Sequence, residues 1–159
     1  MDDAMKKQQA QKMYNIFCQA LDASDWKYKE KEADMIIECG AQGDDLPMDL
    51  VINVNEKLQT VTVFSQLPYS IAEDKRIDIA AAISVINNQL VHGCFDYNIA
   101  NGKIYFRIVS SFQNFLLSQE SCTYMMFCTC NTVDEYNDKF LMLGKGMLSL
   151  EDFIKAENE

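Results

Sequence analysis

The stretch that decides the fold is Phe95-Asp96-Tyr97-Asn98-Ile99-Ala100-Asn101-Gly102-Lys103-Ile104-Tyr105-Phe106-Arg107-Ile108. Apolar and polar residues alternate on both sides of Asn101-Gly102, which is the pattern of two half-buried strands. Asn-Gly favours a type I′ turn, because both central positions of that turn need a positive φ. The sequence therefore predicts a β-hairpin whose second strand turns Ile104, Phe106 and Ile108 to one face.

A helix with two apolar sides precedes this hairpin, over residues 72–91. It follows Pro68, which we expect to end a strand, and it stops before Gly93. One side of the helix carries Ile79, Ile83, Ile86 and Leu90, and the nearly opposite side carries Ile77, Ala81 and Val85. A helix that is apolar on two sides is usually buried on both. The second side therefore predicts a contact with another helix or with a second subunit, and it is the candidate dimer interface.

Upstream of this helix, the chain predicts one helix and a meander of about three antiparallel strands. The helix spans residues 3–23, with Asp2 or Asp3 as its N-cap. The strands begin near Met35, Leu50 and Val61, and the first of them ends near Gly40. Lys, Tyr and Glu alternate between this helix and the first strand, and that segment is not expected to form a strand.

Downstream, residues 119–143 predict a long helix that ends at Gly144. Its buried stripe is expected to be Cys122, Met126, Val133, Tyr136, Phe140 and Leu143. Ser149 then caps a short final helix. The whole chain therefore predicts one α+β domain over residues 1–159, in which helices flank an antiparallel sheet of about five strands.

The formal net charge of −10 is the feature of the composition that most restricts the expected partners. Nucleic acids and anionic membranes usually bind basic patches, so neither is an expected partner. The acidic N-terminus has no apolar stretch after it, which predicts no signal peptide. Six cysteines without such a signal are typical of reduced thiols, and so predict a cytoplasmic protein.

No set of residues in the sequence predicts catalysis, a metal site or a cofactor. Cys128 and Cys130 are two apart on a helix and point away from each other, so we interpret them, with Cys122, as buried and inert thiols. His92, the single histidine, is interpreted as a cation near the end of a helix. Asp44-Asp45 lacks the spacing of a calcium loop. An enzyme would need His92, Arg107 or a cysteine in a cleft.

Methionine and aromatic residues leave two interpretations open. Nine Met and nine Phe could fill a core, or some of them could line an adaptable binding surface. The run Tyr124-Met125-Met126-Phe127 is apolar around a whole helical turn. It is therefore either deeply buried or part of an interface.

Residues along the middle of the chain resemble the YbjN-type proteins, which look like the type III secretion chaperone fold. The matching segments are Leu67-Pro68, Arg76, Ile86-Asn87-Asn88, Gly93-Cys94-Phe95-Asp96 and Asn101-Gly102-Lys103-Ile104-Tyr105-Phe106-Arg107. The resemblance covers roughly residues 15–143. Residues 144–159 extend beyond the pattern as a C-terminal helical extension that could cover a groove used for partners.

The resemblance implies the order helix, three strands, helix, two strands, helix. It also implies a homodimer, often built through the middle helix and neighbouring strands. It implies structural roles for the matching residues Asn87, Gly93, Phe95, Tyr105 and Arg107. Family members are described as candidate sensory-transduction regulators or chaperone-like proteins. The hypothesis is therefore a non-enzymatic, dimeric protein-binding module. The alternative is a regulatory domain that senses a small molecule in a pocket between sheet and helices, lined by Phe and Met, with Arg107 or Lys103 at its mouth.

Overall fold

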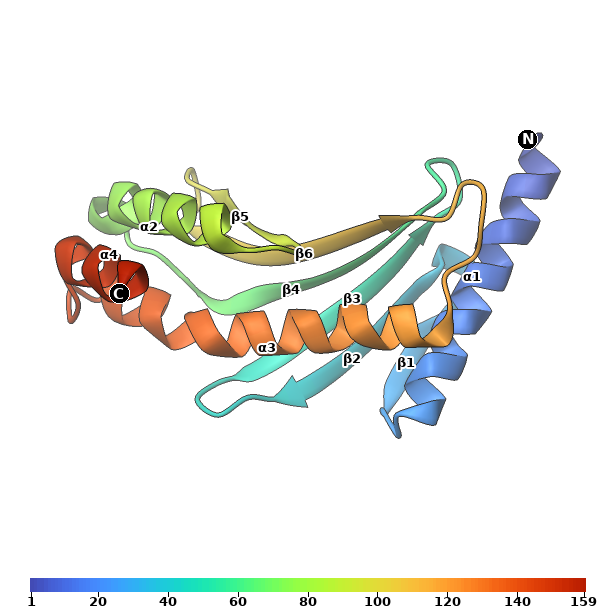
Figure 1. The fold of residues 1–159 in the computed structure, drawn as a ribbon, viewed down its shortest axis with the longest axis horizontal. Coiled ribbons are helices and arrows are strands. Elements are labelled where there is room, and N and C mark those ends of the chain that lie inside the picture. The colour runs from blue at the N-terminus through green and yellow to red at the C-terminus, as the bar shows by residue number, and fades with distance from the viewer.

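The computed structural model describes residues 1–159 and contains four α-helices and one sheet of six strands (Figure 1). The helices are α1 (Asp3–Ala23), α2 (Arg76–Gln89), α3 (Gln119–Gly144) and α4 (Leu150–Asn158). The strands are β1 (Tyr28–Lys31), β2 (Ile36–Gln42), β3 (Pro47–Asn55), β4 (Thr60–Ser70), β5 (Cys94–Asn98) and β6 (Lys103–Ser111). Short 3-10 turns, η1 (Glu32–Asp34) and η2 (Glu73–Lys75), precede β2 and α2.

The sheet is antiparallel throughout, with the strand order β1-β2-β3-β4-β6-β5. The α+β class is confirmed, but the predicted five strands become six. The additional strand is β1, in the segment where Lys and Glu alternate. Charged residues are tolerated there because β1 lies at the edge of the sheet, and Lys31 forms an ion pair with Glu38 of the neighbouring strand.

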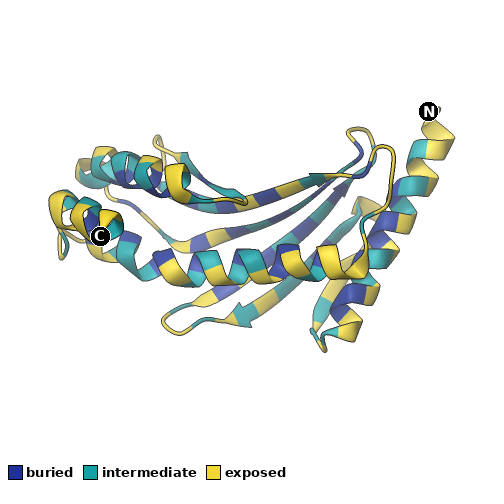
Figure 2. Cartoon of the chain, in the orientation of Figure 1, coloured by how far each residue is buried: buried dark blue, intermediate teal, exposed yellow.

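Helices cover one face of this sheet. In β4, Val61, Val63 and Leu67 are buried, whereas Phe64 is only half-buried and Gln66 is exposed. The same alternation occurs in β6, where Ile104, Phe106 and Ile108 point toward the helices. Figure 2 shows these buried positions alternating with exposed ones along the strands. A sheet with one wet face is common in antiparallel folds.

The long helices begin and end close to the predicted boundaries. The Asp2 carboxylate accepts a hydrogen bond from the Met5 N–H at 2.8 Å, and so it caps α1. Ser118 caps α3, and Ser149 caps α4 through the Asp152 N–H at 3.1 Å. The predicted stripe of α3, from Cys122 to Leu143, is buried.

The middle helix is shorter than predicted. α2 runs over Arg76–Gln89, within the predicted residues 72–91, because η2 forms the first turn and the backbone becomes extended at Leu90. The C-terminal extension packs beside it, since the Gln89 amide donates to the Glu157 carbonyl at 3.0 Å. Phe153 of α4 stacks on Phe140 of α3, with ring centroids 6.0 Å apart. Thus α4 joins α2 to α3 at one end of the molecule (Figure 1).

Two local predictions were wrong. Pro68 does not end a strand, because β4 continues through it to Ser70. Its missing N–H is tolerated there, since the pairing of β4 with β3 stops at Phe64 and its pairing with β6 is irregular between Gln66 and Ser70.

The turn at Asn101-Gly102 is not a two-residue type I′ turn. Four residues, 99–102, connect β5 to β6, and of the central pair only Gly102 has a positive φ, at 74°. The Gly102 N–H donates to the Asn98 carbonyl at 2.8 Å, and the Ile71 N–H donates to the Gly102 carbonyl at 2.9 Å. A Cβ on Gly102 would lie 2.8 Å from the Ile71 nitrogen, so the segment after β4 shapes this turn.

No helix of this structure is both long enough and apolar enough to cross a membrane.

Candidate binding groove at the edge of β6

The open edge of β6 is the feature around which the candidate site is built. β5 pairs with β6 only from Lys103 to Arg107, so the last four residues of β6 have a partner on one side alone, namely β4. Gly93 immediately precedes β5 and turns the chain there, with a φ of 75°. A Cβ there would strike the Phe106 ring and lie 2.9 Å from the Arg107 carbonyl oxygen. Only glycine lets the chain approach β6 so closely as it enters the sheet.

The pairing register shows which backbone groups of β6 face this open edge. The Phe112 N–H donates to the Gln59 carbonyl at 2.9 Å, directly after the pair Thr60 and Ser111. Hydrogen-bonded and non-hydrogen-bonded pairs alternate in an antiparallel ladder. Ile108 and Ser110 therefore exchange hydrogen bonds with β4. The N–H and C=O groups of Val109 and Ser111 point the other way, toward the space that β5 leaves empty.

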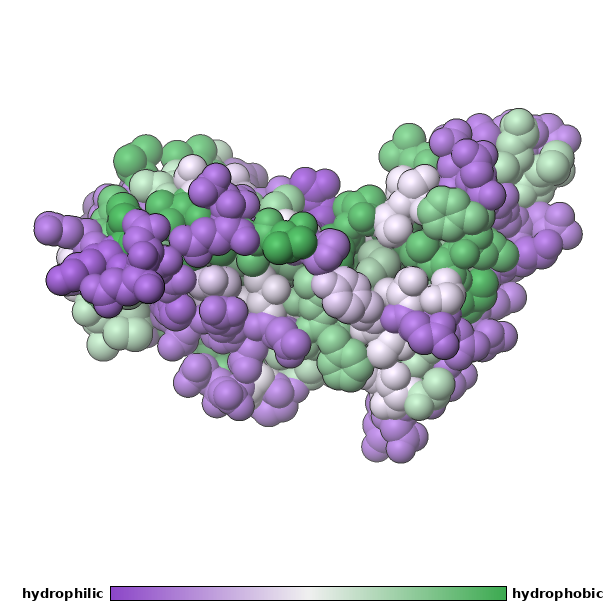
Figure 3. All heavy atoms as spheres, viewed as in Figure 1, coloured by the Kyte–Doolittle hydropathy of each residue, from purple (hydrophilic) through white to green (hydrophobic).

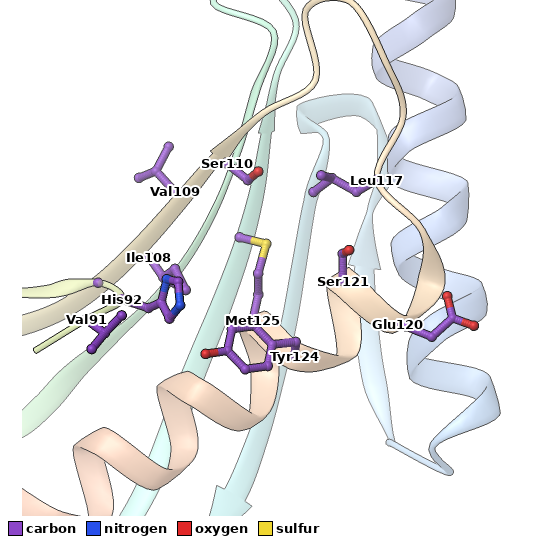
Figure 4. A pocket seen from close by; sticks show the side chains of 11 residues that line it. Val91, His92, Ile108, Val109, Ser110, Leu117, Glu120, Ser121, Tyr124 and Met125 are labelled. Carbon is purple, nitrogen blue, oxygen red and sulfur yellow. The ribbon is translucent and has the colours of Figure 1, made fainter.

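A groove of about 500 Å³ lies along this edge. It separates β6 from the segment before β5 and from the first turns of α3. Figure 4 shows the lining side chains around the space, with Met125 and Tyr124 rising from α3 and Leu117 reaching in from the connection before it. The His92 and Tyr124 rings meet edge to face, with centroids 5.5 Å apart, and they form one wall.

The groove is bordered by apolar side chains that solvent reaches. Val91 is 87% exposed, Tyr124 52% and Val109 45%. Phe127, one turn further along α3, is also exposed. In Figure 3, hydrophobic residues lie on both sides of the hollow between the two ends of the molecule. Exposed apolar side chains around a concave surface are typical of binding sites.

Glu120 is the one acidic residue that lines the groove. It lies in the first turn of α3, where the helix dipole favours negative charge. Hydrogen bonds from its own backbone N–H and from the Ser118 hydroxyl lower the pKa of the Glu120 carboxyl. This end of the groove therefore carries a negative charge at neutral pH.

Three of the residues named from the family resemblance, Asn87, Gly93 and Phe95, hold β5 in place, and the position of β5 leaves the end of β6 open. The Asn87 side chain donates to the Phe95 carbonyl at 2.9 Å and accepts from the Phe95 N–H at 2.8 Å. The buried Phe95 ring then meets Phe106 and Phe140 edge to face. With Gly93, these contacts fix the position at which β5 begins.

Arg107 and Tyr105 lie on the opposite, wet face of the sheet. The Arg107 guanidinium contacts both carboxylate oxygens of Asp96, at 2.6 Å and 3.1 Å. This hydrogen bonding raises the pKa of Arg107. Tyr105 is half-buried beside it. Neither Arg107 nor Lys103 lines the groove, so the groove is not the pocket with one of them at its mouth that would support small-molecule sensing.

The candidate dimer interface lies on the outer side of α2. Ile77 is 70% exposed, while Ala81 and Val85 are half-buried beside the face that packs inward. The inward face is made of Ile79, Ala82, Ile83 and Ile86. The dimer through Ile77, Ala81 and Val85 stays a prediction.

The cysteines are free, and burial dominates their chemistry. Cys122 is fully buried, whereas Cys128 and Cys130 are only partly buried, contrary to expectation. Burial raises the pKa of Cys122 to about 12 and that of Cys130 to about 11. No three His, Cys, Asp or Glu side chains cluster in a way that could hold a metal ion.

His92 lies in surroundings that differ from those expected. α2 ends at Gln89, so His92 is three residues beyond it and contacts Tyr124 instead of the helix end. On α3, Asp134 accepts the Asp44 N–H at 2.9 Å and fastens the loop between β2 and β3 to that helix.

The groove itself was not predicted, although the sequence carried one sign of it. In the run Tyr124 to Phe127 the two methionines are buried, as one interpretation expected. The two aromatic residues are exposed, and for them the interface stays a prediction. Val109 gave no sign, because its place beside the groove depends on β5 being shorter than β6.

Comparison with known proteins gives one informative likeness. No known family model matches the chain, and no curated protein matches it in sequence. Among solved structures, YbjN from E. coli, proposed to be a transcription regulator, matches with a TM-score of 0.57 at 14% identity. The match covers 79% of this chain and 92% of YbjN. The resemblance seen in the sequence is thus confirmed for the fold, and this chain has a YbjN-like fold.

Proposed function

We propose that this chain is a non-enzymatic, dimeric protein-binding module that acts in a chaperone-like or regulatory role. The groove beside β6 is the observation that carries the proposal. It combines an open strand edge with exposed apolar side chains at Val91, Val109 and Tyr124. Strand edges and apolar grooves are two surfaces by which domains recurrently recognise segments of other proteins.

Two further properties support this role. The fold is shared with YbjN, itself proposed to be a regulator. The net charge of −10 keeps a protein with exposed apolar surface soluble and disfavours acidic partners. Dimerisation through Ile77, Ala81 and Val85 would present two grooves in one assembly.

A second candidate is the sensing of a small molecule in the same groove. The volume of about 500 Å³ favours it, because pockets for small ligands are usually about 300 to 1,000 Å³. The lining includes Met125, as expected, but no Phe. The groove is also open along its length, and small-molecule sites usually enclose most of the ligand. Protein binding is therefore the better supported function.

Selection from a random peptide library displayed on phage tests the proposal with the native chain. We expect a family of related peptides to be enriched and to bind in solution. A matched selection on the variant Tyr124→Lys should enrich far fewer of them, because a charge then enters the apolar wall. If the native chain enriches no related peptides, the protein-binding function is wrong. A compound library that raises the melting temperature would then favour the small-molecule alternative.

A further inference from the structure

We infer that the groove receives an extended segment of a partner protein, which pairs with β6 at Val109 and Ser111 and continues the line of β5. The inference rests on the proposed protein-binding function and specifies its mode. The first residue of β5, Cys94, pairs with Arg107 of β6. Beyond Arg107, the two outward-facing backbone positions of β6 have no strand beside them. The partner segment lies beside the part of β6 that β5 is too short to cover.

The backbone of β6 identifies the occupant as a polypeptide. Val109 and Ser111 each present an N–H and a C=O away from β4, toward the open edge of β6, at the two-residue repeat of a strand. An extended chain matches this repeat of donors and acceptors at every second residue. The free length, residues 108–111, accommodates a segment of about four or five residues at roughly 3.3 Å per residue.

The walls specify the side chains of that segment. On the helix side of β6, Met125 and Tyr124 stand opposite the added strand, together with Leu117 (Figure 4). On the other side of the sheet, Val109 faces solvent. Side chains alternate across a strand. The segment therefore carries apolar residues at alternate positions that face α3, with polar or β-branched residues between them.

Charge specifies one end of the segment and argues against a second copy of this chain. Glu120 lines the groove at the first turn of α3, and it favours a Lys or Arg on the partner there. A second copy paired edge to edge would bring another acidic chain, of net charge −10, against the groove that Glu120 lines. A basic, extended segment of another protein carries the charge opposite to that of Glu120. The assigned partner is thus a protein with a flexible basic segment of alternating apolar residues.

Removing one backbone donor tests the inference, with peptides selected by phage display on the native chain as probes. Val109→Pro deletes the N–H that faces the groove and leaves the hydrogen bonds to β4 intact. Val109→Thr keeps that N–H and is the matched control. We expect Val109→Pro to weaken peptide binding by about tenfold or more, and Val109→Thr by less than about threefold.

A second test leaves the protein unchanged, so the folding of a proline variant does not decide the result. Two versions of each peptide are made, giving two N-methylated sets. One set carries N-methyl groups on the odd-numbered backbone nitrogens and the other on the even-numbered ones. We expect one set to lose binding and the other to keep it, because only alternate N–H groups face β6. In the native chain, bound peptide should also slow hydrogen exchange at the Val109 and Ser111 amides.

The charge assignment has its own test. Glu120→Lys should weaken binding of a peptide with a terminal Lys by about threefold. It should strengthen binding of the same peptide with Glu in place of that Lys. Equal binding by Val109→Pro and Val109→Thr, or equal loss with both N-methylated sets, would overturn strand addition while leaving protein binding in place. A native dimer that Val109→Pro alone dissociates would also overturn it, since a second copy would then occupy the edge.

Discussion

The Asn87 side chain binds both backbone groups of Phe95, with its amide donating to the carbonyl at 2.9 Å and its oxygen accepting the N–H at 2.8 Å. A helix residue thereby replaces the neighbouring strand that β5 lacks on its outer side. This pair holds β5 at the edge of the sheet, and it places the Phe95 ring in the core against Phe106 and Phe140.

Asn87→Ala should lower the free energy of unfolding by about 2 to 3 kcal/mol, because two hydrogen bonds disappear and two half-buried backbone groups lose their partners. Urea denaturation followed by circular dichroism measures the change. Asn88→Ala, on the exposed side of the same helix, is the control and should change stability by less than about 0.5 kcal/mol. Equal effects of the two substitutions would show that Asn87 does not fasten β5.

Gly93→Ala should destabilise the fold by more than Gly146→Ala, although both residues have a positive φ, 75° and 72° respectively. At Gly146 the nearest atom to an added Cβ is 3.7 Å away, so the variant carries only the conformational cost of about 1 kcal/mol. At Gly93 the Cβ also strikes the Phe106 ring. Thermal melts of both variants measure the difference, and similar melting temperatures would contradict the crowding at Gly93.

The dimer is tested on the exposed side of α2. We expect the native chain to be a dimer by light scattering and the double variant Ile77→Asp/Val85→Asp to be a folded monomer, because two buried charges would be unpaired in the interface. Leu58→Asp, at an equally exposed apolar residue in the turn between β3 and β4, is the control and should leave the mass unchanged. A monomeric native chain would show that Ile77, Ala81 and Val85 face solvent in the working protein.

Stability should fall as the solution becomes alkaline. Burial raises the pKa of Cys39 and Cys122 from 9.0 to about 12. Between those values the folded chain holds protons that the unfolded chain has released, so the free energy of unfolding decreases as pH rises. The stabilisation is complete below about pH 9 and is lost toward pH 12.

Urea denaturation in reducing buffer at about pH 8 and about pH 10.5 measures this slope. Cys122→Ala removes one titrating thiol, so its free energy of unfolding should fall less between the two conditions. A slope that is the same in both proteins would show that Cys122 does not titrate with a raised pKa.

Local patterns predicted most of the fold. Alternation in β3, β4 and β6, helical spacing in α1 and α3, and the cap at Ser149 depend on neighbours within a few residues, and the structure confirms them. β1 could not be predicted, because its four residues are polar and become a strand only through pairing with β2. The turn at Gly102 was misjudged for a similar reason, since Ile71, distant in sequence, shapes it.

The sequence by itself determined the α+β class, the order of the long elements, the acidic charge and the residues of the core, because periodicity and composition are properties of the chain alone. Only the tertiary structure decided where the candidate groove lies. The groove exists because β5 begins only after Gly93 while β6 continues to Ser111, and because Tyr124 of α3 stands across the gap. Those three residues are brought together by strand pairing and helix packing, which depend on distances in space and leave no spacing in the sequence.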